Sequence, residues 1–569
     1  MWYNKEEELM REGVEKSASL PVNCGLCAYN MKWIARSDAT TISEAVCRSS
    51  GCSIESLKHP ATTEPWDIEG LEDAALLIDS CLKSGMHISI IGDYDTDGVT
   101  ATAILYLMFT ALGAKPDIRL PHRMSEGYGL SVSIVDEIIQ KNPNGLLLTV
   151  DNGISAFDAI AHAKSAGMTV IVLDHHLPGQ SLPNADVVVD QWIHPDSVSS
   201  FYCGAGLAFK LAQYLLVGKD EILEKLSALA AIGTVGDVMS LTNDNRAIVQ
   251  SGIAAMDNGH ITQGLKCVLE ASGKAKFDAT TLAFYIVPMI NAAGRLLDDG
   301  ARLPCAILSA ESQVTRYAEK LKNLNNERKE MVKTQLDEML AALGPAETPP
   351  SIPVIVFSES CHEGIVGILA GKLAENYHVP AIVFTRTDGK WKGSARSIEG
   401  VNLVEHLNKM SGSMLGYGGH AGAAGLTVAL GAEDTFRAAA KTAFSDVQPV
   451  DSSVEYYDVT LTEDQVPASF EEQEGLEPFG EGCPKPLVRV RNCRIIPGRN
   501  GKLAFYMGKG QEHVKLKCRS FAILGFFMSD VYRQLGEPEY VDVIGYLEMN
   551  ISQYGKELQV NAQAILPAN

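Results

Sequence analysis

Three aspartates alternate in the segment GDYDTDG, which follows the apolar run HISII directly. Because this segment begins and ends with glycine, its backbone can turn sharply enough to direct more than one of the carboxylates of Asp93, Asp95 and Asp97 towards one point. So much negative charge at one point is stable only where cations neutralise it. These residues therefore indicate a site for divalent metal ions.

Two further apolar runs end in side chains of the same kinds. LLLTV is followed by Asp151, and MTVIVL is followed by DHH, which contains His175 and His176. Mixed carboxylate and imidazole ligands suit Mn²⁺ better than Mg²⁺, which prefers oxygen ligands and keeps several waters. Two such ions about 4 Å apart activate a water molecule and neutralise the charge that develops on a phosphoryl group. With Asp151 able to bridge them, the pattern indicates a two-metal phosphoesterase.

A structural explanation exists for each of these residues taken alone. An aspartate after a strand is commonly only the N-cap of the following helix, and a single histidine is more often structural than a ligand. The joint pattern is harder to explain in this way, because three consecutive predicted strands end in residues that bind metals. We therefore favour the metal site.

The elements that must position these residues are short β-rich runs, each followed by a helical stretch. Such alternation is typical of βαβ units and a parallel sheet, in which ligands bind beyond the carboxyl ends of the strands. The polar clusters fall at those ends. VVVD is a further predicted strand, and GAGLAFKLAQYLL and EILEKLSALAAIGTVGDVMS are predicted helices, the second with Asp237 near its end.

The remaining chain predicts two more domains. A stretch from Ser309 to Leu343 without Gly or Pro predicts one long helix, followed by the linker GPAETPPSIP. A second α/β unit has strands at PVIVF and PAIVF, and ends in two predicted glycine-rich loops, GKWKGSARS and GYGGHAGAAG. From about residue 452, short strands between turn residues are typical of a small all-β domain such as an OB-fold.

We therefore predict an α/β protein in which a parallel-sheet domain and a smaller α/β domain are joined by a long helix and followed by an all-β, OB-like domain. The predicted segments are an N-terminal segment (1–70), a catalytic domain (71–308), the helix with its linker (309–350), a substrate-binding domain (351–450) and a nucleic-acid-binding domain (451–569).

Composition limits the partners and the compartment. A formal net charge of −22 argues against a chain that coats nucleic acid indiscriminately, although a local basic channel remains compatible with it. No apolar run has the length of a signal-peptide core or a membrane span. We expect a cytoplasmic protein that does not bind membranes.

Four of the twelve cysteines form a cluster near the N-terminus. Cys24 and Cys27 have C-x-x-C spacing, and Cys47 and Cys52 follow about twenty residues later. Four thiolates could hold a structural zinc ion, but the second pair is spaced loosely for a zinc ribbon. In a chain without an export signal we expect ordinary reduced thiols, with zinc as the alternative.

The motifs GDYDTDG, VDNG, LDHH and TVGDVM, in this order, resemble the DHH phosphoesterase superfamily and, more narrowly, the RecJ exonucleases, from about residue 80 to the C-terminus. The resemblance implies that His176 orients the scissile phosphate or protonates the leaving oxygen, with Asp151 also catalytic. It implies these metal ligands: Asp93 and Asp95 for one ion, Asp97, His175 and Asp237 for the other, and Asp151 bridging the two.

Further segments also resemble RecJ, among them PHRMSEGYGL, INAAGRL, WKGSARS, GYGGHAGAAG and LEPFGEGCPKP. Glycines bring backbone N–H groups close to phosphates, and arginine offers a matching fork of donors. Two features depart from the family: the first 70 or so residues match poorly, and Cys483 stands where asparagine is commoner. The resemblance implies a 5′-phosphate and substrate site formed by Arg123, Asn291, Arg295, Ser394, Arg396 and, close to the metals, His420.

The β-rich tail contains basic and aromatic side chains on or beside its predicted strands. Bases stack on aromatic faces while Lys and Arg follow the backbone, without reading sequence; the alternative is that these are ordinary surface and core residues. The candidates for single-stranded DNA binding are Phe505, Tyr506, Lys515, Lys517, Arg519 and Tyr554.

The leading functional hypothesis is a 5′-to-3′ exonuclease specific for single-stranded DNA, acting in repair and recombination with two divalent ions, Mn²⁺ favoured and Mg²⁺ the alternative. A second hypothesis is a DHH-type small-molecule phosphoesterase that cleaves short oligonucleotides or cyclic dinucleotides. A third is a scaffold without activity, which the filled ligand positions argue against. A helicase and a single-strand-binding protein are candidate partners, and we expect a monomer.

Overall fold

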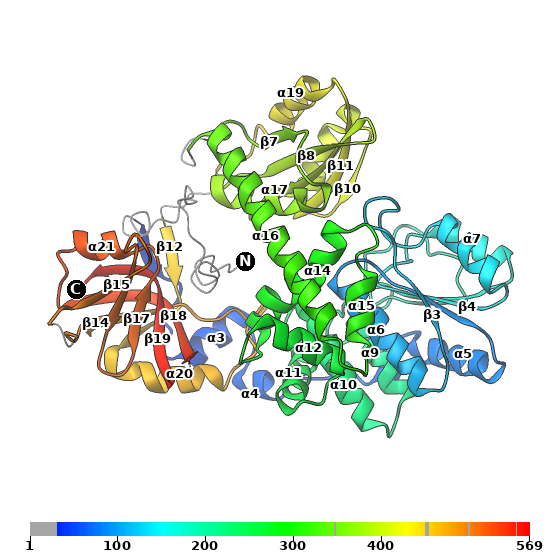
Figure 1. The fold of residues 1–569 in the computed structure, drawn as a ribbon, viewed down its shortest axis with the longest axis horizontal. Helices are drawn as coiled ribbons and strands as arrows, with labels where there is room; N and C mark the ends of the chain where they lie inside the picture. Colours follow the sequence, from blue (N-terminus) through cyan, green and yellow to red (C-terminus); the bar gives the residue numbers. More distant parts are fainter. Residues whose placement is uncertain (1–30, 346–348, 450–453, 499–500, 553–554, 569) are drawn as a thin grey trace. The chain divides into compact units, whose positions relative to one another are not determined.

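The computed structural model describes residues 31–345, 349–449, 454–498, 501–552 and 555–568 (Figure 1). The chain forms two compact units. The N-terminal unit comprises residues 46–326 and 473–485, and the C-terminal unit comprises the described residues of 1–45, 327–472 and 486–569.

A five-stranded, wholly parallel sheet forms the centre of the N-terminal unit, with the order β3-β2-β4-β5-β6. Every residue of β2 and β4 is buried, as expected for strands covered on both faces. The predicted parallel sheet is therefore present, and β2, β4 and β5 lie side by side in it. The strands are β2 (Ile88–Ile91), β3 (Asp117–Arg119), β4 (Leu146–Val150), β5 (Thr169–Leu173) and β6 (Val187–Val189).

Helices cover both faces of this sheet. Because strand side chains alternate between faces, Leu146 and Leu148 of β4 join the core formed with α5, α6 and α9, whereas Leu147 joins the core formed with α7 and α8. Figure 1 shows α5, α6, α7 and α9 around β3 and β4. The helices are α5 (Leu71–Lys83), α6 (Thr96–Ala111), α7 (Val132–Lys141), α8 (Phe157–Ser165) and α9 (Gly204–Leu215).

A group of helices completes the N-terminal unit, and α10 packs closely against α6 and α9. A Cβ on Gly233 of α10 would lie 2.4 Å from the Cβ of Ala205 and 2.9 Å from Oδ1 of Asp97, so only glycine permits this approach. The helices that complete the unit are α4 (Ile54–Lys58), α10 (Asp220–Gly236), α11 (Asn243–Asn258), α12 (Gln263–Ser272), α13 (Ala279–Thr281), η3 (Leu282–Ile286), α14 (Val287–Leu296) and α15 (Arg302–Leu308).

The predicted long helix is α16 (Thr315–Leu343), which begins later than the expected Ser309. Ser309 instead ends α15, because its Oγ donates a hydrogen bond to the carbonyl of Cys305 at 2.9 Å. The carbonyl of the next residue, Ala310, accepts from the N–H of Gly264 at 2.9 Å. These contacts hold Ser309 and Ala310 against α12, so α16 begins later in the sequence than predicted.

A mixed five-stranded sheet with the order β10-β11-β9-β8-β7 follows in the C-terminal unit. The prediction of glycine-rich loops here is wrong, because GKWKGSARS and GYGGHAGAAG contribute β9, β10 and β11. A Cβ on Gly393 would lie 2.4 Å from the ring of Phe384 on the neighbouring strand, so glycine makes room for an aromatic ring. The elements are β7 (Val354–Ser358), α17 (Val366–Tyr377), β8 (Ala381–Thr387), β9 (Lys390–Arg396), α18 (Leu403–Lys409), β10 (Gly416–Gly419), β11 (Ala423–Ala429) and α19 (Glu433–Ala443).

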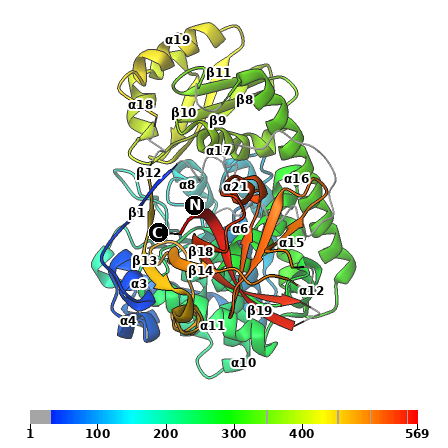
Figure 2. The ribbon, with the colours of Figure 1, turned by 90° about the vertical axis from the view of Figure 1, so that its left-hand side faces the viewer.

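The tail forms a seven-stranded sheet with the order β13-β14-β18-β19-β17-β16-β15. Figure 2 shows β14, β18 and β19 side by side, and the two long strands β18 and β19 pair antiparallel. The elements are β13 (Val459–Thr462), α20 (Val466–Glu474), β14 (Val488–Arg494), β15 (Ala504–Met507), β16 (His513–Lys517), β17 (Ala522–Gly525), α21 (Ser529–Gln534), β18 (Tyr540–Ser552) and β19 (Gly555–Pro567).

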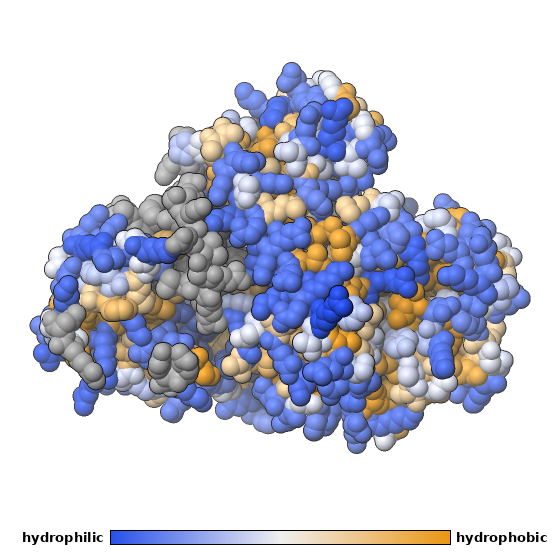
Figure 3. Space-filling model, in the orientation of Figure 1, coloured by the Kyte–Doolittle hydropathy of each residue, from blue (hydrophilic) through white to orange (hydrophobic). Residues whose placement is uncertain are grey.

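The segment before α4 contributes β1 (Lys32–Ala35) and α3 (Ile42–Ser50), and β1 pairs in parallel with β12 (Val454–Tyr457). Among the described residues, no helix is both long and apolar enough to cross a membrane. The face in Figure 3 is mainly hydrophilic.

Candidate metal centre

The turn after β2 depends on two glycines. A Cβ on Gly92 would lie 1.9 Å from Oγ1 of Thr102, and a Cβ on Gly98 would lie 2.5 Å from the backbone nitrogen of Asp93. Both distances are shorter than real atoms allow, so only glycine lets the chain pass this closely from β2 into α6. The turn places Asp93 at the carboxyl end of β2, followed by Asp95.

Helix N-termini hold the second and third aspartates of this turn. Asp95 is the N-cap of α6, and its Oδ1 accepts a hydrogen bond from the backbone N–H of Gly98 at 3.1 Å. Asp97 accepts from the first residues of α9: its Oδ2 from the N–H of Gly204 at 2.6 Å, and its Oδ1 from the N–H of Ala205 at 2.8 Å. The partial positive charge at the start of α9 therefore faces the Asp97 carboxylate and fixes both oxygens.

Asp151 follows β4 in a left-handed backbone conformation with a φ of 61°, which is uncommon for a residue with a side chain. Its surroundings hold this conformation: Oη of Tyr128 donates to its carbonyl at 2.8 Å, and its own N–H donates to the carbonyl of Leu173 at 3.0 Å. Oδ1 of Asp151 lies 3.0 Å from Nε2 of His175. Asp151 thereby joins the ends of β4 and β5.

Seven side chains form three overlapping groups of ligand atoms at this edge of the sheet, and two of these groups consist of the six predicted ligands. Within each group, one ligand atom from every residue lies within 4.8 Å of the others. Asp237, the C-cap of α10, completes the second group, with its Oδ2 3.7 Å from Nδ1 of His175. The first group is Asp93, Asp95 and Asp151, the second is Asp97, His175 and Asp237, and the third is Asp151, His175 and His176.

The carboxylates of this cluster repel one another when no cation is present. Burial and the charge of Asp95 raise the pKa of Asp93 well above its ordinary value. Burial and the charge of Asp97 raise the pKa of Asp237 to about 8 and that of Asp151 well above its ordinary value. Oδ1 of Asp93 is buried and has no hydrogen-bond partner among the described residues. Divalent cations would remove the repulsion and bind the unpartnered oxygen, so these residues fit metal ions.

Asp174 is a further site residue, which the sequence analysis did not single out. It is buried after β5, where its Oδ1 accepts from the N–H of His175 at 2.8 Å and lies 2.8 Å from Nδ1 of His176. Although burial opposes it, the Asp174 carboxylate raises the pKa of His176 to about 9. Burial lowers the pKa of His175, which favours the neutral imidazole that ligates metals. Asp174 follows its strand as Asp93 and Asp151 follow theirs, a signal that could have identified it.

Two aromatic residues hold the histidine segment and were also missed. Nε1 of Trp192 donates to the carbonyl of His175 at 3.0 Å. Oη of Tyr128 lies 3.0 Å from Nδ1 of His176, and the two rings meet edge to face with centroids 5.4 Å apart. No residue pattern in the sequence links these positions to the histidines.

Three of the predicted phosphate-binding residues lie beside the aspartate turn. Oδ1 of Asn291 accepts from the N–H of Thr96 at 2.9 Å. The guanidinium of Arg123 lies over the ring of Tyr94, 4.5 Å from its centroid. Burial raises the pKa of Tyr94 to about 12, while the positive charges of Arg123 and Arg295 oppose this rise. The N-terminal unit therefore brings two arginines and an amide to the same turn as the carboxylates.

The other three predicted phosphate-binding residues lie together in the C-terminal unit. Ser394 and Arg396 share a face of β9, where an Arg396 nitrogen donates to Oγ of Ser394 at 2.9 Å. A Cβ on Gly367 of α17 would lie 2.8 Å from the Arg396 guanidinium. His420 is exposed on the turn after β10, and Gly422 of the same turn accepts from the N–H of Ser397 at 3.0 Å. The structure thus gathers a hydroxyl, a guanidinium and an imidazole.

The candidate DNA-binding residues of the tail divide between two faces of its sheet. Phe505 is 66% exposed and pairs across the ladder with Lys515, and Lys517 shares that face. Tyr506 faces the other way and donates to Glu537 at 2.9 Å, while Lys515 is paired with Glu557 at 2.6 Å. Arg519 is exposed beyond β16. Tyr554 lies outside the described residues, as do Cys24 and Cys27.

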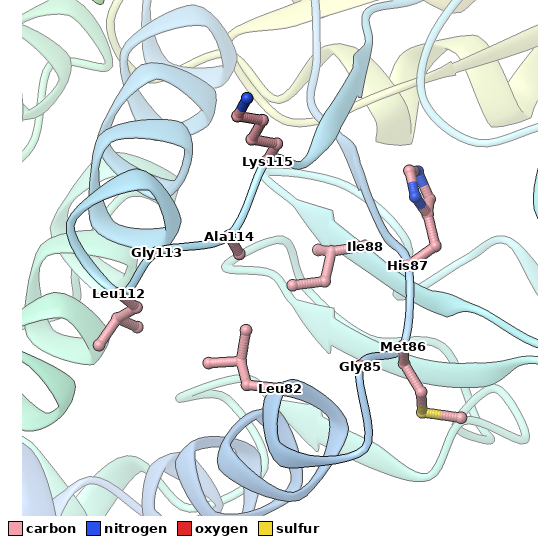
Figure 4. Close-up of a pocket in the computed structure, with 9 residues that line it drawn as sticks. All are labelled: Leu82, Gly85, Met86, His87, Ile88, Leu112, Gly113, Ala114 and Lys115. Atoms are coloured by element: carbon pink, nitrogen blue, oxygen red, sulfur yellow. The ribbon is translucent and has the colours of Figure 1, made fainter.

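A hollow of about 350 Å³ lies at the other end of β2 (Figure 4). His87 and Ile88 begin this strand, whereas Asp93 follows its last residue, so the hollow lies away from the candidate metal centre. It has no part in the site. Its lining includes Leu82, Met86, His87, Ile88, Leu112 and Lys115.

The sheet, the carboxylate cluster and the later domains define a protein of the DHH type. Residues 87–234 match the DHH family N-terminal domain, residues 351–446 match the DHHA1 domain, and residues 457–564 match the RecJ OB domain. The class predicted from the motifs is therefore confirmed.

Comparison with individual relatives identifies the family within this class to which the chain belongs. The chain is 32% identical to the single-stranded-DNA-specific exonuclease RecJ of Thermus thermophilus, over 87% of this chain and 70% of that protein. It is also 32% identical to the RecJ of Bacillus subtilis, over 86% of this chain, and it spans only 62% of that relative's length. A crystal structure of RecJ from Thermus thermophilus in complex with Mn²⁺ matches with a TM-score of 0.77 and 28% identity, covering 94% of this chain and 79% of that one. The chain belongs to the RecJ family, and the predicted fold class is confirmed.

Proposed function

We propose that this chain is an exonuclease that hydrolyses phosphodiester bonds of single-stranded DNA in the 5′-to-3′ direction with two divalent metal ions. One observation supports it most: two adjacent groups of three ligand residues meet at the carboxyl ends of three neighbouring strands. The RecJ relatives, named as single-stranded-DNA-specific exonucleases, support the choice of substrate.

The two ligand groups would each hold one metal ion. We assign Asp93 and Asp95 to one ion and Asp97, His175 and Asp237 to the other, with Asp151 between them. Because one group includes an imidazole, we favour Mn²⁺, with Mg²⁺ as the alternative, and the Mn²⁺ complex of the Thermus relative supports this. When bound, two such ions supply an activated water and neutralise charge on the phosphate.

The protein's own contribution to bond cleavage centres on His176. Its pKa of about 9 keeps it protonated at neutral pH, so it can donate a hydrogen bond to the scissile phosphate or a proton to the leaving oxygen. Asp174 orients this ring through Nδ1, with their atoms 2.8 Å apart. Asp174 is therefore a positioning residue, and His176 is the candidate acid.

A 5′-phosphate site would set the polarity. Arginine presents a planar fork that matches phosphate oxygens, and the C-terminal unit holds Arg396 against Ser394. We assign the terminal phosphate to Ser394 and Arg396, and substrate phosphates to Arg123, Asn291 and Arg295, with His420 as a further contact.

The C-terminal β domain would bind the DNA strand along its backbone. Phe505 and Lys517 are exposed on one face and offer an aromatic surface and a cation for a sequence-independent contact. A helicase and a single-strand-binding protein, a monomeric state, a cytoplasmic location, and roles in repair and recombination remain predictions.

The division into the five segments predicted from the sequence is also part of the proposal. The long helix α16 and the three matched regions, 87–234, 351–446 and 457–564, support it.

A substrate comparison tests the proposed function. With Mn²⁺, we expect rapid digestion of a long single-stranded oligonucleotide and slow digestion of the same sequence as a duplex or of a dinucleotide. Faster turnover of the dinucleotide would instead favour a small-molecule phosphoesterase. Equal digestion of duplex and single strand would contradict the proposed specificity.

A further inference from the structure

A carboxylate far along the chain fastens the segment that carries Arg123. Asp298 follows α14, and its Oδ1 accepts hydrogen bonds from the N–H groups of Met124 at 2.9 Å and Ser125 at 3.1 Å. Its Oδ2 accepts from Oγ of Ser125 at 2.6 Å. The carbonyl of Asp298 accepts a further bond from the N–H of Arg123 at 3.3 Å. One residue is thus bonded to three consecutive residues of the segment.

These hydrogen bonds favour the charged form of Asp298. The bond from the Ser125 hydroxyl, together with the bonds from the backbone, lowers the pKa of Asp298, and bonds to a charged acceptor are stronger than those between neutral groups. The segment also closes on itself, since the N–H groups of Glu126 and Gly127 donate to the carbonyl of His122 at 2.9 and 3.1 Å. The backbone around Ser125 therefore cannot shift without breaking several bonds.

The same segment reaches the metal centre at its other end. Oη of Tyr128 donates to the carbonyl of Asp151 at 2.8 Å and lies 3.0 Å from Nδ1 of His176. A short stretch of chain therefore connects Arg123 to the metal centre. Asp298 fixes the end of that stretch that carries the arginine.

The guanidinium of Arg123 lies close to the carboxylates of the aspartate turn. It stacks over the ring of Tyr94, 4.5 Å from the centroid. Its positive charge opposes the rise in pKa that burial causes in Asp93 and Asp95. An arginine side chain is flexible, so its fork of donors meets a phosphate at a defined place only where its backbone is also fixed. Asp298 supplies that fixed backbone.

We propose that Asp298 is a positioning residue that holds Arg123 for its contact with a substrate phosphate. The inference rests on the proposed function, because the phosphate belongs to the bound DNA strand. An acidic side chain near DNA ordinarily weakens binding by repulsion. Here the hydrogen bonds of Asp298 place the arginine, and this effect outweighs the repulsion. Removal of the carboxylate should therefore weaken DNA binding, although it also removes a negative charge.

Three variants of the full-length protein separate the hydrogen bonds of Asp298 from its charge. Asp298→Ala removes both, whereas Asp298→Asn removes the charge and keeps an oxygen that can accept the backbone N–H groups. Asp299→Asn is the matched control, because it removes the same charge from the next residue, whose side chain is 54% exposed. We expect affinity to fall roughly tenfold in Asp298→Ala, as for loss of one hydrogen bond to a charged group. It should fall much less in Asp298→Asn and not at all in Asp299→Asn.

Gel shifts with a 5′-phosphorylated single-stranded oligonucleotide in chelator measure these affinities without cleavage. Repeating them at several salt concentrations counts the phosphate contacts, since each contact to a single strand contributes about 0.7 to the slope of log affinity against log salt. We expect the slope to become shallower by about 0.7 in Asp298→Ala and by the same amount in Arg123→Ala. A fold damaged elsewhere would not reproduce the slope of the arginine variant.

The double variant Arg123→Ala/Asp298→Ala shows whether Asp298 acts through Arg123. It should bind no more weakly than Arg123→Ala alone, because a residue that acts through another has no effect once the other is removed. Ser125→Ala, which deletes only the hydroxyl bond and leaves the backbone bonds in place, should weaken binding by a smaller factor and likewise have no effect in the Arg123→Ala background.

Additive losses in the double variant, unchanged affinity in Asp298→Ala, or equal losses in Asp298→Ala and Asp299→Asn would overturn the inference. The proposed function is tested apart from it, by cleavage of the same oligonucleotide by the wild type in Mn²⁺. That cleavage can fail while the affinities in chelator still decide the role of Asp298.

Discussion

Removing one carboxylate of the metal centre should stabilise the metal-free protein. Asp237 is the most suitable site, because it ends α10 without accepting the backbone hydrogen bonds that Asp97 accepts from α9. In Asp237→Asn the side chain keeps its shape and loses its charge. We expect the variant to unfold less readily than the wild type in a chelator and to lose most of the stabilisation by Mn²⁺.

The size of this effect follows from the pKa of Asp237, which is about 8 in the metal-free fold against about 3.9 in an unfolded chain. Between these values the folded protein binds a proton that the unfolded chain has released, so the free energy of unfolding falls as pH rises from about 4 to about 8. At about 1.4 kcal/mol per pH unit, the wild type loses about 4 kcal/mol by pH 7. The side chain is 30% exposed, so solvent screening reduces our expectation to about 2–3 kcal/mol.

Urea unfolding at pH 4.5 and pH 7, with chelator or with Mn²⁺, measures this difference. In chelator, the free energies of unfolding of Asp237→Asn and the wild type should be similar at pH 4.5 and should differ at pH 7. Saturating Mn²⁺ should stabilise the wild type more than the variant, because a ligand stabilises a protein by about 2.7 kcal/mol at 100 times its Kd. Asp158→Asn, on the exposed surface of α8, is the control and should change stability by less than about 0.5 kcal/mol. Equal stability of Asp237→Asn and wild type in chelator at pH 7 would refute the reasoning.

Three further predictions address catalysis. Asp97→Asn should abolish cleavage while leaving the affinity for single-stranded DNA within about twofold in a gel-shift assay, and retained cleavage would contradict the assigned ligand. Arg396→Lys should lower the ratio of rates on 5′-phosphorylated and 5′-hydroxyl DNA by roughly tenfold, since lysine lacks the fork of arginine; an unchanged ratio would remove Arg396 from the phosphate site. The rate should fall at alkaline pH, where His176 loses its proton, and in Asp174→Asn the fall should occur at lower pH, because the Asp174 carboxylate raises the pKa of His176; coinciding pH profiles would argue against His176 as the acid.

The sequence was most informative where chemistry and strand pattern coincide. Buried apolar runs that end in Asp93, Asp151 and DHH predicted the strands, their parallel arrangement and the convergence of their carboxyl ends, because a parallel sheet brings those ends together. Asp237 was harder to place, since it comes from a helix far along the chain; only the family resemblance assigned it to the site.

Other features depend on contacts that no local pattern encodes. Asp97 accepts hydrogen bonds from the start of α9, more than a hundred residues later, and Arg246 meets carbonyls from both ends of its unit. The glycine-rich segments were misassigned because glycine is typical of turns, whereas Gly393 makes room for a ring on the neighbouring strand.

The central proposal is a metal-dependent exonuclease that starts at a 5′ end. The most direct test is a time course with one 5′-phosphorylated single-stranded oligonucleotide, labelled at its 5′ end in one sample and at its 3′ end in the other, in Mn²⁺. We expect the 5′ label to appear at once as a mononucleotide while the 3′-labelled strand shortens progressively, and neither change in chelator. Release of the 3′ label first, or internal cuts in both samples, would contradict the proposal.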